Sequence, residues 1–185
     1  MEPEPSSARD FEFTGTLADI VAIIESAKAR GGRDALERHA AKMLVGATEA
    51  EVREAADVAA EIIESIPVFL ARARQEAGHR GLESIVGPLL EQAERYFVRP
   101  VDLMPEMTQG LPGLLDDAYL VIRTLQNLDK GREPFLDWDL DYPERFLRRL
   151  IGAQVAQRLD QIALNAMKDV SARLSEMWSR LSHPA

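Results

Sequence analysis

A regular spacing of apolar residues near the C-terminus is the feature that most constrains the fold of this chain. Ten apolar positions between Leu147 and Leu181 recur every three or four residues, so nine steps cover 34 residues, about 3.8 residues per step. This repeat favours a straight or slightly right-handed packing, because a left-handed coiled coil needs 3.5. The pattern predicts a long C-terminal helix over 143–183, roughly 55 Å in length at 1.5 Å per residue.

Such a helix is longer than a compact body of this size. Its end is therefore expected either to pack along several shorter helices or to protrude and contact a partner, which includes dimerisation through this helix. Trp178 lies near the end and is a candidate contact, because aromatic residues are enriched at protein interfaces. Arg145, Arg148 and Arg149 predict a basic patch where the helix begins.

Helical spacing also organises the rest of the chain. Thr14 or Thr16 can cap a first helix that stops at Gly31, and Thr48 with Glu51 has the form of a capping box. Pro67 predicts a kink or break in the helix that follows, because proline lacks the amide donor. Further helices are expected over 34–45, 82–98 and 114–128. No stretch of the sequence shows the alternation of apolar and polar residues that is typical of a β-strand. The sequence predicts an all-α protein, a bundle of about five to six helices.

Composition and charge narrow the classes of function. The chain has no cysteine, which excludes thiolate chemistry and fits the cytoplasm, and the first ten residues lack the apolar core of a signal peptide. The net charge is −9, but residues 144–185 carry +3, so the first 143 residues carry −12. An acidic body argues against nucleic-acid binding. The basic C-terminal segment either neutralises that body or contacts an acidic partner or an anionic membrane surface.

Four regions follow from these patterns. We expect a disordered tail over 1–12, a helical body over 13–131, an acidic linker over 132–142 and the long helix over 143–183. The linker contains Asp137, Asp139 and Asp141, but Tyr142 and Arg148 occupy positions that an EF-hand requires to be glycine and glutamate. We therefore expect the linker to pack through its apolar residues, with Asp141 capping the last helix.

A turn rich in prolines and acids interrupts the body between two predicted helices. Its distinctive residues are Pro100, Asp102, Pro105, Gly113, Asp116 and Asp117. In one interpretation the acids cap helix ends, where the helix dipole favours negative charge. In the other, Asp102, Asp116 and Asp117 converge on a divalent cation such as Mg²⁺, Mn²⁺ or Ca²⁺, with Arg99 and Arg123 as alternative neutralising groups.

The same turn resembles a known family. Tyr96, Pro100, the run Val-Asp-Leu-Met-Pro-Glu over 101–106, Gly113 and the run Leu-Asp-Asp over 115–117 are similar to the motif of the YkvA-like family, domain of unknown function DUF1232, across roughly 82–128. Glu106 replaces an aspartate, an expected proline is missing, and one extra residue separates Asp102 from Asp116. The resemblance implies a small, helical, bacterial-type domain, sometimes membrane-associated, and supplies no reaction.

These observations predict a non-catalytic interaction or scaffolding module that needs no cofactor. Two alternatives remain open. The acidic turn favours a metal-dependent hydrolase that uses an aspartate cluster. The basic C-terminal helix favours a cytoplasmic protein that associates peripherally with a membrane.

Overall fold

The computed structural model describes residues 15–98, 110–129 and 135–182, except for the side chains of residues 174, 177, 178, 181 and 182. Within these residues all regular structure is helical, which confirms the all-α prediction with seven α-helices rather than five to six. The elements are α1 (Thr16–Ala29), α2 (Gly32–Met43), α3 (Glu49–His79), α4 (Glu83–Val98), the 3-10 helix η3 (Leu111–Leu114), α5 (Leu115–Leu128), α6 (Asp141–Ile151) and α7 (Ala153–Ser182).

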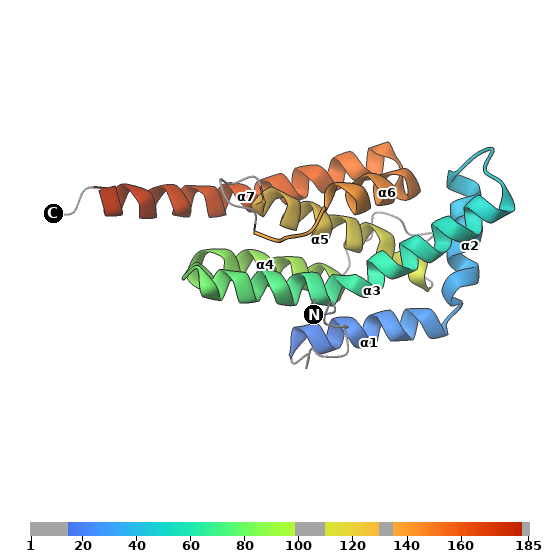
Figure 1. Cartoon of the computed structure of the whole chain (residues 1–185), viewed down its shortest axis with the longest axis horizontal. Coiled ribbons are helices and arrows are strands. Elements are labelled where there is room, and N and C mark those ends of the chain that lie inside the picture. Colours follow the sequence, from blue (N-terminus) through green and yellow to red (C-terminus); the bar gives the residue numbers. More distant parts are fainter. Residues whose placement is uncertain (1–14, 99–109, 130–134, 183–185) are drawn as a thin grey trace, which may run out of the picture.

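Helix α5 lies at the centre of the bundle. It packs against α3 and α4 on one side and against α6 and α7 on the other (Figure 1). Twelve of its 14 residues are buried, and the two that are not are Arg123 and Gln126. A helix so enclosed is normally apolar all round. Because α5 also contains acids, an arginine and a tyrosine, its polar groups need partners inside the protein.

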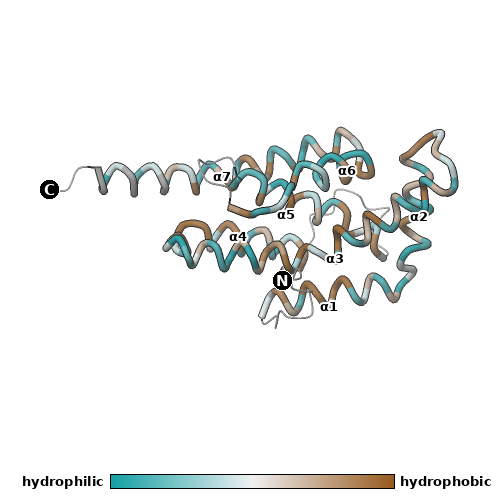
Figure 2. The backbone as a smooth tube through the Cα atoms, in the orientation of Figure 1, coloured by the Kyte–Doolittle hydropathy of each residue, from teal (hydrophilic) through white to brown (hydrophobic). Residues whose placement is uncertain are grey.

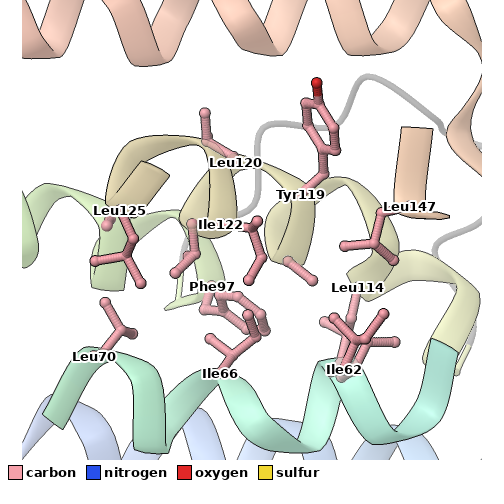
Figure 3. Packing of buried hydrophobic residues seen from close by; sticks show 14 of the residues in the cluster. Ile62, Ile66, Leu70, Phe97, Leu114, Tyr119, Leu120, Ile122, Leu125 and Leu147 are labelled. Carbon is pink, nitrogen blue, oxygen red and sulfur yellow. The ribbon is translucent and has the colours of Figure 1, made fainter. Parts of the chain in front are cut away.

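The core between α3 and α5 consists of aliphatic side chains around one aromatic ring. Ile62, Ile66 and Leu70 line one face of α3, and Phe97 from α4 lies between them and α5 (Figure 3). These four side chains are at most 8% exposed. Their spacing of four residues along α3 follows the helical repeat. Figure 2 shows this arrangement as hydrophobic inner faces and hydrophilic outer faces along the bundle.

Local sequence signals had mixed outcomes. The capping box at α3 is confirmed, with the Thr48 amide donating to Glu51 Oε2 over 2.7 Å and the Glu51 amide donating to Thr48 Oγ1 over 3.2 Å. The expected break at Pro67 is absent, since α3 runs unbroken for 31 residues. Packing of the buried face on both sides of Pro67 holds the helix together. At α1 the N-cap is Gly15, not a threonine, and no side chain caps it; Thr14 lies outside the described residues.

The predicted C-terminal helix is two helices. Gly152 separates α6 from α7 with φ 88° and ψ 155°, a conformation that only glycine adopts without strain. The apolar spacing continues across Gly152 because α6 and α7 each bury an apolar face. Helix α7 alone has 30 residues, about 45 Å at 1.5 Å per residue, so the long C-terminal helix is present but begins at Ala153.

Helix α7 leaves the bundle before it ends. Its inner positions are buried as far as Val170, which is 5% exposed. From Ser171 to Arg180 each described side chain is exposed. Figure 1 shows this last part of α7 extending past the α3–α4 turn, with no other helix beside it. We call residues 171–182 the distal segment.

Candidate functional site

The acidic turn is described only in part. Pro100, Asp102 and Pro105 lie outside the described residues, as does Arg99. Asp116 and Asp117 occupy the first turn of α5, as predicted, and they are 5% and 2% exposed. Asp116 Oδ1 accepts a hydrogen bond from the Asp117 amide over 2.9 Å. In the described part of the chain no group of three or more acidic or histidine side chains is placed to hold a metal ion.

In the described part of this turn, Gly110 is the glycine that adopts a positive φ. Gly110 has φ 81°, and a Cβ there would lie 3.5 Å from the carbonyl oxygens of Ala27 and Arg30. The turn therefore approaches the end of α1 closely in a left-handed conformation. Gly113 lies within η3 and has no positive φ.

A partly buried polar network joins α5, α6 and α7, and sequence reasoning missed it. Tyr119 of α5 is fully buried, and its hydroxyl points away from the aliphatic core (Figure 3). The hydroxyl lies 2.6 Å from Asp160 Oδ1 of α7 and 3.1 Å from Glu144 Oε1 of α6. A phenol has one proton, and the shorter distance gives it to Asp160.

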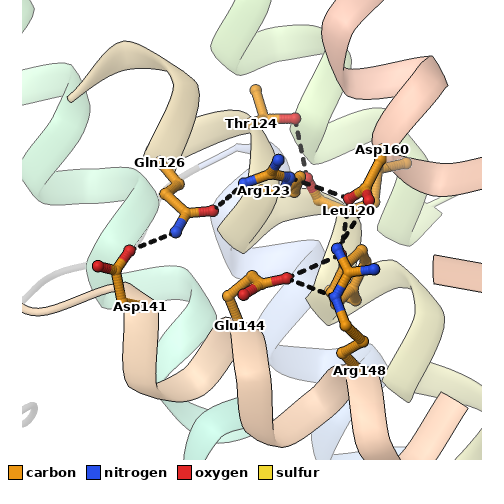
Figure 4. A network of polar contacts seen from close by, with 9 residues as sticks. Leu120, Arg123, Thr124, Gln126, Asp141, Glu144, Arg148 and Asp160 are labelled. Atoms are coloured by element: carbon orange, nitrogen blue, oxygen red, sulfur yellow. Dashed lines mark hydrogen bonds and ion pairs between the residues drawn. The ribbon is translucent and has the colours of Figure 1, made fainter. Parts of the chain in front are cut away.

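Arg148 of α6 connects the same groups. Its Nε donates to Glu144 Oε1 over 2.8 Å, and its Nη2 donates to Asp160 Oδ2 over 2.7 Å and to the Tyr119 hydroxyl over 2.6 Å (Figure 4). Arg123 of α5 donates from Nε to Asp160 Oδ1 over 2.9 Å. Two guanidinium groups thus face two carboxylates, so the network is neutral in sum. We call Tyr119, Arg123, Glu144, Arg148 and Asp160 the junction network.

The pKa values of Tyr119, Asp160 and Arg148 are all shifted away from neutral pH. Burial, together with the hydrogen bond and charge of Asp160, raises the pKa of Tyr119 far above its ordinary value. Burial alone would raise the pKa of Asp160, but hydrogen bonds from Tyr119 and Arg148 lower it overall. Burial alone would lower the pKa of Arg148, and its hydrogen bonds to Asp160 and Glu144 raise it instead. A neutral phenol between ionised partners serves as a fixed donor, which suits orientation of helices rather than proton transfer.

This assignment corrects two interpretations of the arginines. Arg123 pairs with Asp160 of α7, not with the acidic turn. Arg148 faces the junction network, while Arg145 and Arg149 are exposed, so the three arginines do not form one surface patch. The side chain of Trp178, the fourth residue of the predicted interaction surface, lies outside the described residues.

The acidic linker packs much as its apolar residues predicted. Leu140 is 3% exposed, and the Trp138 ring lies against the Phe69 ring of α3 with centroids 4.8 Å apart. The cap of α6 differs, because Asp139 Oδ1 accepts from the Asp141 amide over 2.9 Å, so Asp139 rather than Asp141 serves the helix start. This side chain precedes the helix, where Asx side chains usually bond to backbone amides.

Comparison of the chain with protein-family models, curated proteins and solved structures finds no match. The similarity to the YkvA-like family therefore stays a prediction. None of the helices in the described ranges has the length and apolar character to cross a bilayer.

Proposed function

We propose that this protein is an interaction module that binds a second copy of itself through the distal segment of α7. One observation supports the proposal most directly: the apolar spacing of α7 continues beyond the point where the body stops. Leu159, Ala163 and Val170 are at most 5% exposed against the bundle. By helical spacing, positions 174, 177 and 181 continue the same face, and the sequence places leucine, methionine and leucine there.

The junction network supports this function by fixing the direction of α7. Asp160 lies in the packed half of the helix and binds groups from both α5 and α6. A partly buried network with several ion pairs and hydrogen bonds rigidifies the elements that it joins. An interaction helix held in one orientation loses less entropy on binding than a flexible one.

Self-association can be measured on the full chain by sedimentation velocity between 1 and about 100 µM. The wild type is expected to exceed the 20.6 kDa mass of one chain as its concentration rises. Trp178→Glu is expected to raise the dissociation constant at least tenfold, because it replaces a large apolar residue with a charge at a position that continues the face of Val170 by helical spacing. Ser179→Glu is the matched control, since Ser179 is an exposed neighbour and receives the same charge.

A wild type that remains one chain at every concentration would contradict the proposal. So would equal association by the Trp178→Glu and Ser179→Glu variants. Circular dichroism of each variant establishes that it is folded.

A further inference from the structure

A second unpartnered apolar surface lies at the opposite end of the molecule. Among the described residues, large apolar side chains are exposed at six positions, and three of these gather where α2 turns into α3 and α6 begins. They are Met43, Val45 and Tyr142, which are 36%, 93% and 54% exposed. Figure 2 shows hydrophobic residues on this α2–α3 connection. Contiguous exposed apolar surface marks interaction sites more often than single exposed residues do.

This surface encloses a groove of about 480 Å³ between the start of α3 and α6, which we call the elbow groove. Val45, Phe146 and Tyr142 contribute apolar walls, and the rings of Tyr142 and Phe146 stack with centroids 6.2 Å apart. Its size is in the range of pockets that take a few large side chains. Side chains spaced three or four residues apart on one helix are the usual occupants of such a groove.

Charges around the elbow groove favour a basic helix. Glu51 and Glu54 line it from α3 and Arg149 lines it from α6, so the charged residues of its lining sum to −1. Glu51 is held in place by the capping box, whose hydrogen bonds from the Thr48 backbone and side chain lower its pKa, so it is ionised at neutral pH. The distal segment carries Arg173 and Arg180 against one acid, Glu176. The segment therefore complements both the acidic side of the groove and its apolar walls.

We infer that the elbow groove of one copy binds the distal segment of another, which rests on the proposed self-association through α7. The groove cannot bind the distal segment of its own chain. Leu150 lines the groove, and α7 begins three residues later and runs about 45 Å away from it. In Figure 1 the α2–α3 connection and the last turns of α7 lie at opposite ends of the bundle.

Association of two different surfaces has a consequence for the assembly. A contact between unlike surfaces either closes, as a reciprocal dimer or a ring, or leaves one groove and one distal segment unpaired at the ends and continues by adding copies. Pairing of two distal segments with each other stops at a closed dimer. Because a closed dimer is possible in both arrangements, the groove variant rather than the mass separates them.

Two full-length variants test the inference by complementation. Val45→Glu disables the groove at a residue that is 93% exposed, so the fold tolerates it, and Trp178→Glu disables the distal segment. Each variant alone is expected to remain a single chain at concentrations where the wild type assembles. An equal mixture is expected to form a dimer of one copy of each and nothing larger. Leu164→Glu is the matched control, since it charges an exposed apolar residue outside the groove and is expected to assemble like the wild type.

Association of Val45→Glu equal to that of the wild type would overturn the inference and leave self-association through α7 intact. A mixture of the two folded variants that stays monomeric would also overturn it. If Val45→Glu does not fold, Tyr142→Glu replaces it, because that side chain is 54% exposed on the other wall of the groove.

Discussion

Helix α7 has two halves with different surroundings, although one spacing of apolar residues runs through both. The first half packs on α4 and α5 and contributes Asp160 to the junction network. In the distal segment, every side chain that the structure describes is exposed to solvent. An apolar repeat therefore identifies a helix face that needs covering, and only the structure tells which part the protein itself covers. The uncovered part is where we place the interaction.

The sharpest test of this comparison truncates one leucine in each half. Leu159→Ala, in the packed half and 1% exposed, is expected to lower the free energy of unfolding by about 3 kcal/mol, because it leaves a cavity. Leu174→Ala, in the distal segment, is expected to change it by less than about 0.5 kcal/mol at concentrations where the chain is a monomer. Urea denaturation measures both values. Similar losses would show that the distal segment packs on its own chain.

The next test breaks the network that holds the packed half. Arg148→Met leaves the carboxylates of Glu144 and Asp160 without their main partner. We expect a loss of about 2–3 kcal/mol, less than the about 3–5 kcal/mol for a fully buried ion pair that loses one partner, since a quarter of the Asp160 side chain is exposed. Arg145→Met on the same helix is the control and should cost less than about 0.5 kcal/mol. Equal effects in urea denaturation would mean that the network contributes nothing specific.

A smaller change removes only the hydroxyl of Tyr119. Tyr119→Phe keeps the ring in its buried position but takes a donor from Asp160 and an acceptor from Arg148. The expected loss is about 1–2 kcal/mol, because partially buried charges lose a hydrogen bond. Tyr142→Phe, at an exposed ring, should leave thermal stability unchanged. A neutral effect of Tyr119→Phe would show that water replaces the hydroxyl.

The smallest expected effect concerns pH and α2. Burial lowers the pKa of His39 below its ordinary value of 6.5, although its hydrogen bond to the Leu150 carbonyl opposes the shift. The unfolded chain then binds a proton at a higher pH than the folded chain does, so stability falls as pH drops below about 6.5. Between pH 7.5 and pH 5.5 the melting temperature of the wild type should fall more than that of the His39→Gln variant. An identical pH dependence would exclude this contribution.

Much of the fold could be predicted because helix spacing is a local property. The buried faces of α4 and the capping box of Thr48 follow from residues three and four apart. The break at Gly152 was missed because Leu147, Ile151 and Val155 keep the spacing across it. One glycine within a helical pattern is also tolerated often enough to give no signal.

The site was less predictable because its partners are distant in the sequence. Tyr119 and Asp160 are 41 residues apart, and a charged residue on a helix is usually solvated, so Arg148 was assigned to the surface. A usable signal did exist. Tyr119 and Arg123 are four residues apart on a helix that is otherwise largely apolar around them, and two polar groups on one face of a buried helix require partners from elsewhere.

The central position of α5 also has a consequence for biosynthesis. The face of α3 that carries Ile66 and Leu70 is covered by α5, but α3 is complete at His79 and α5 begins only at Leu115. At about 5–20 residues per second, a ribosome needs about 2–7 s to synthesise the intervening 35 residues. During that interval the nascent chain displays an aliphatic stripe without its final cover. Chaperones that recognise exposed hydrophobic segments would bind the nascent chain at that stage. A transcript truncated before α5 would yield a chain whose stripe stays exposed, and this chain would be degraded.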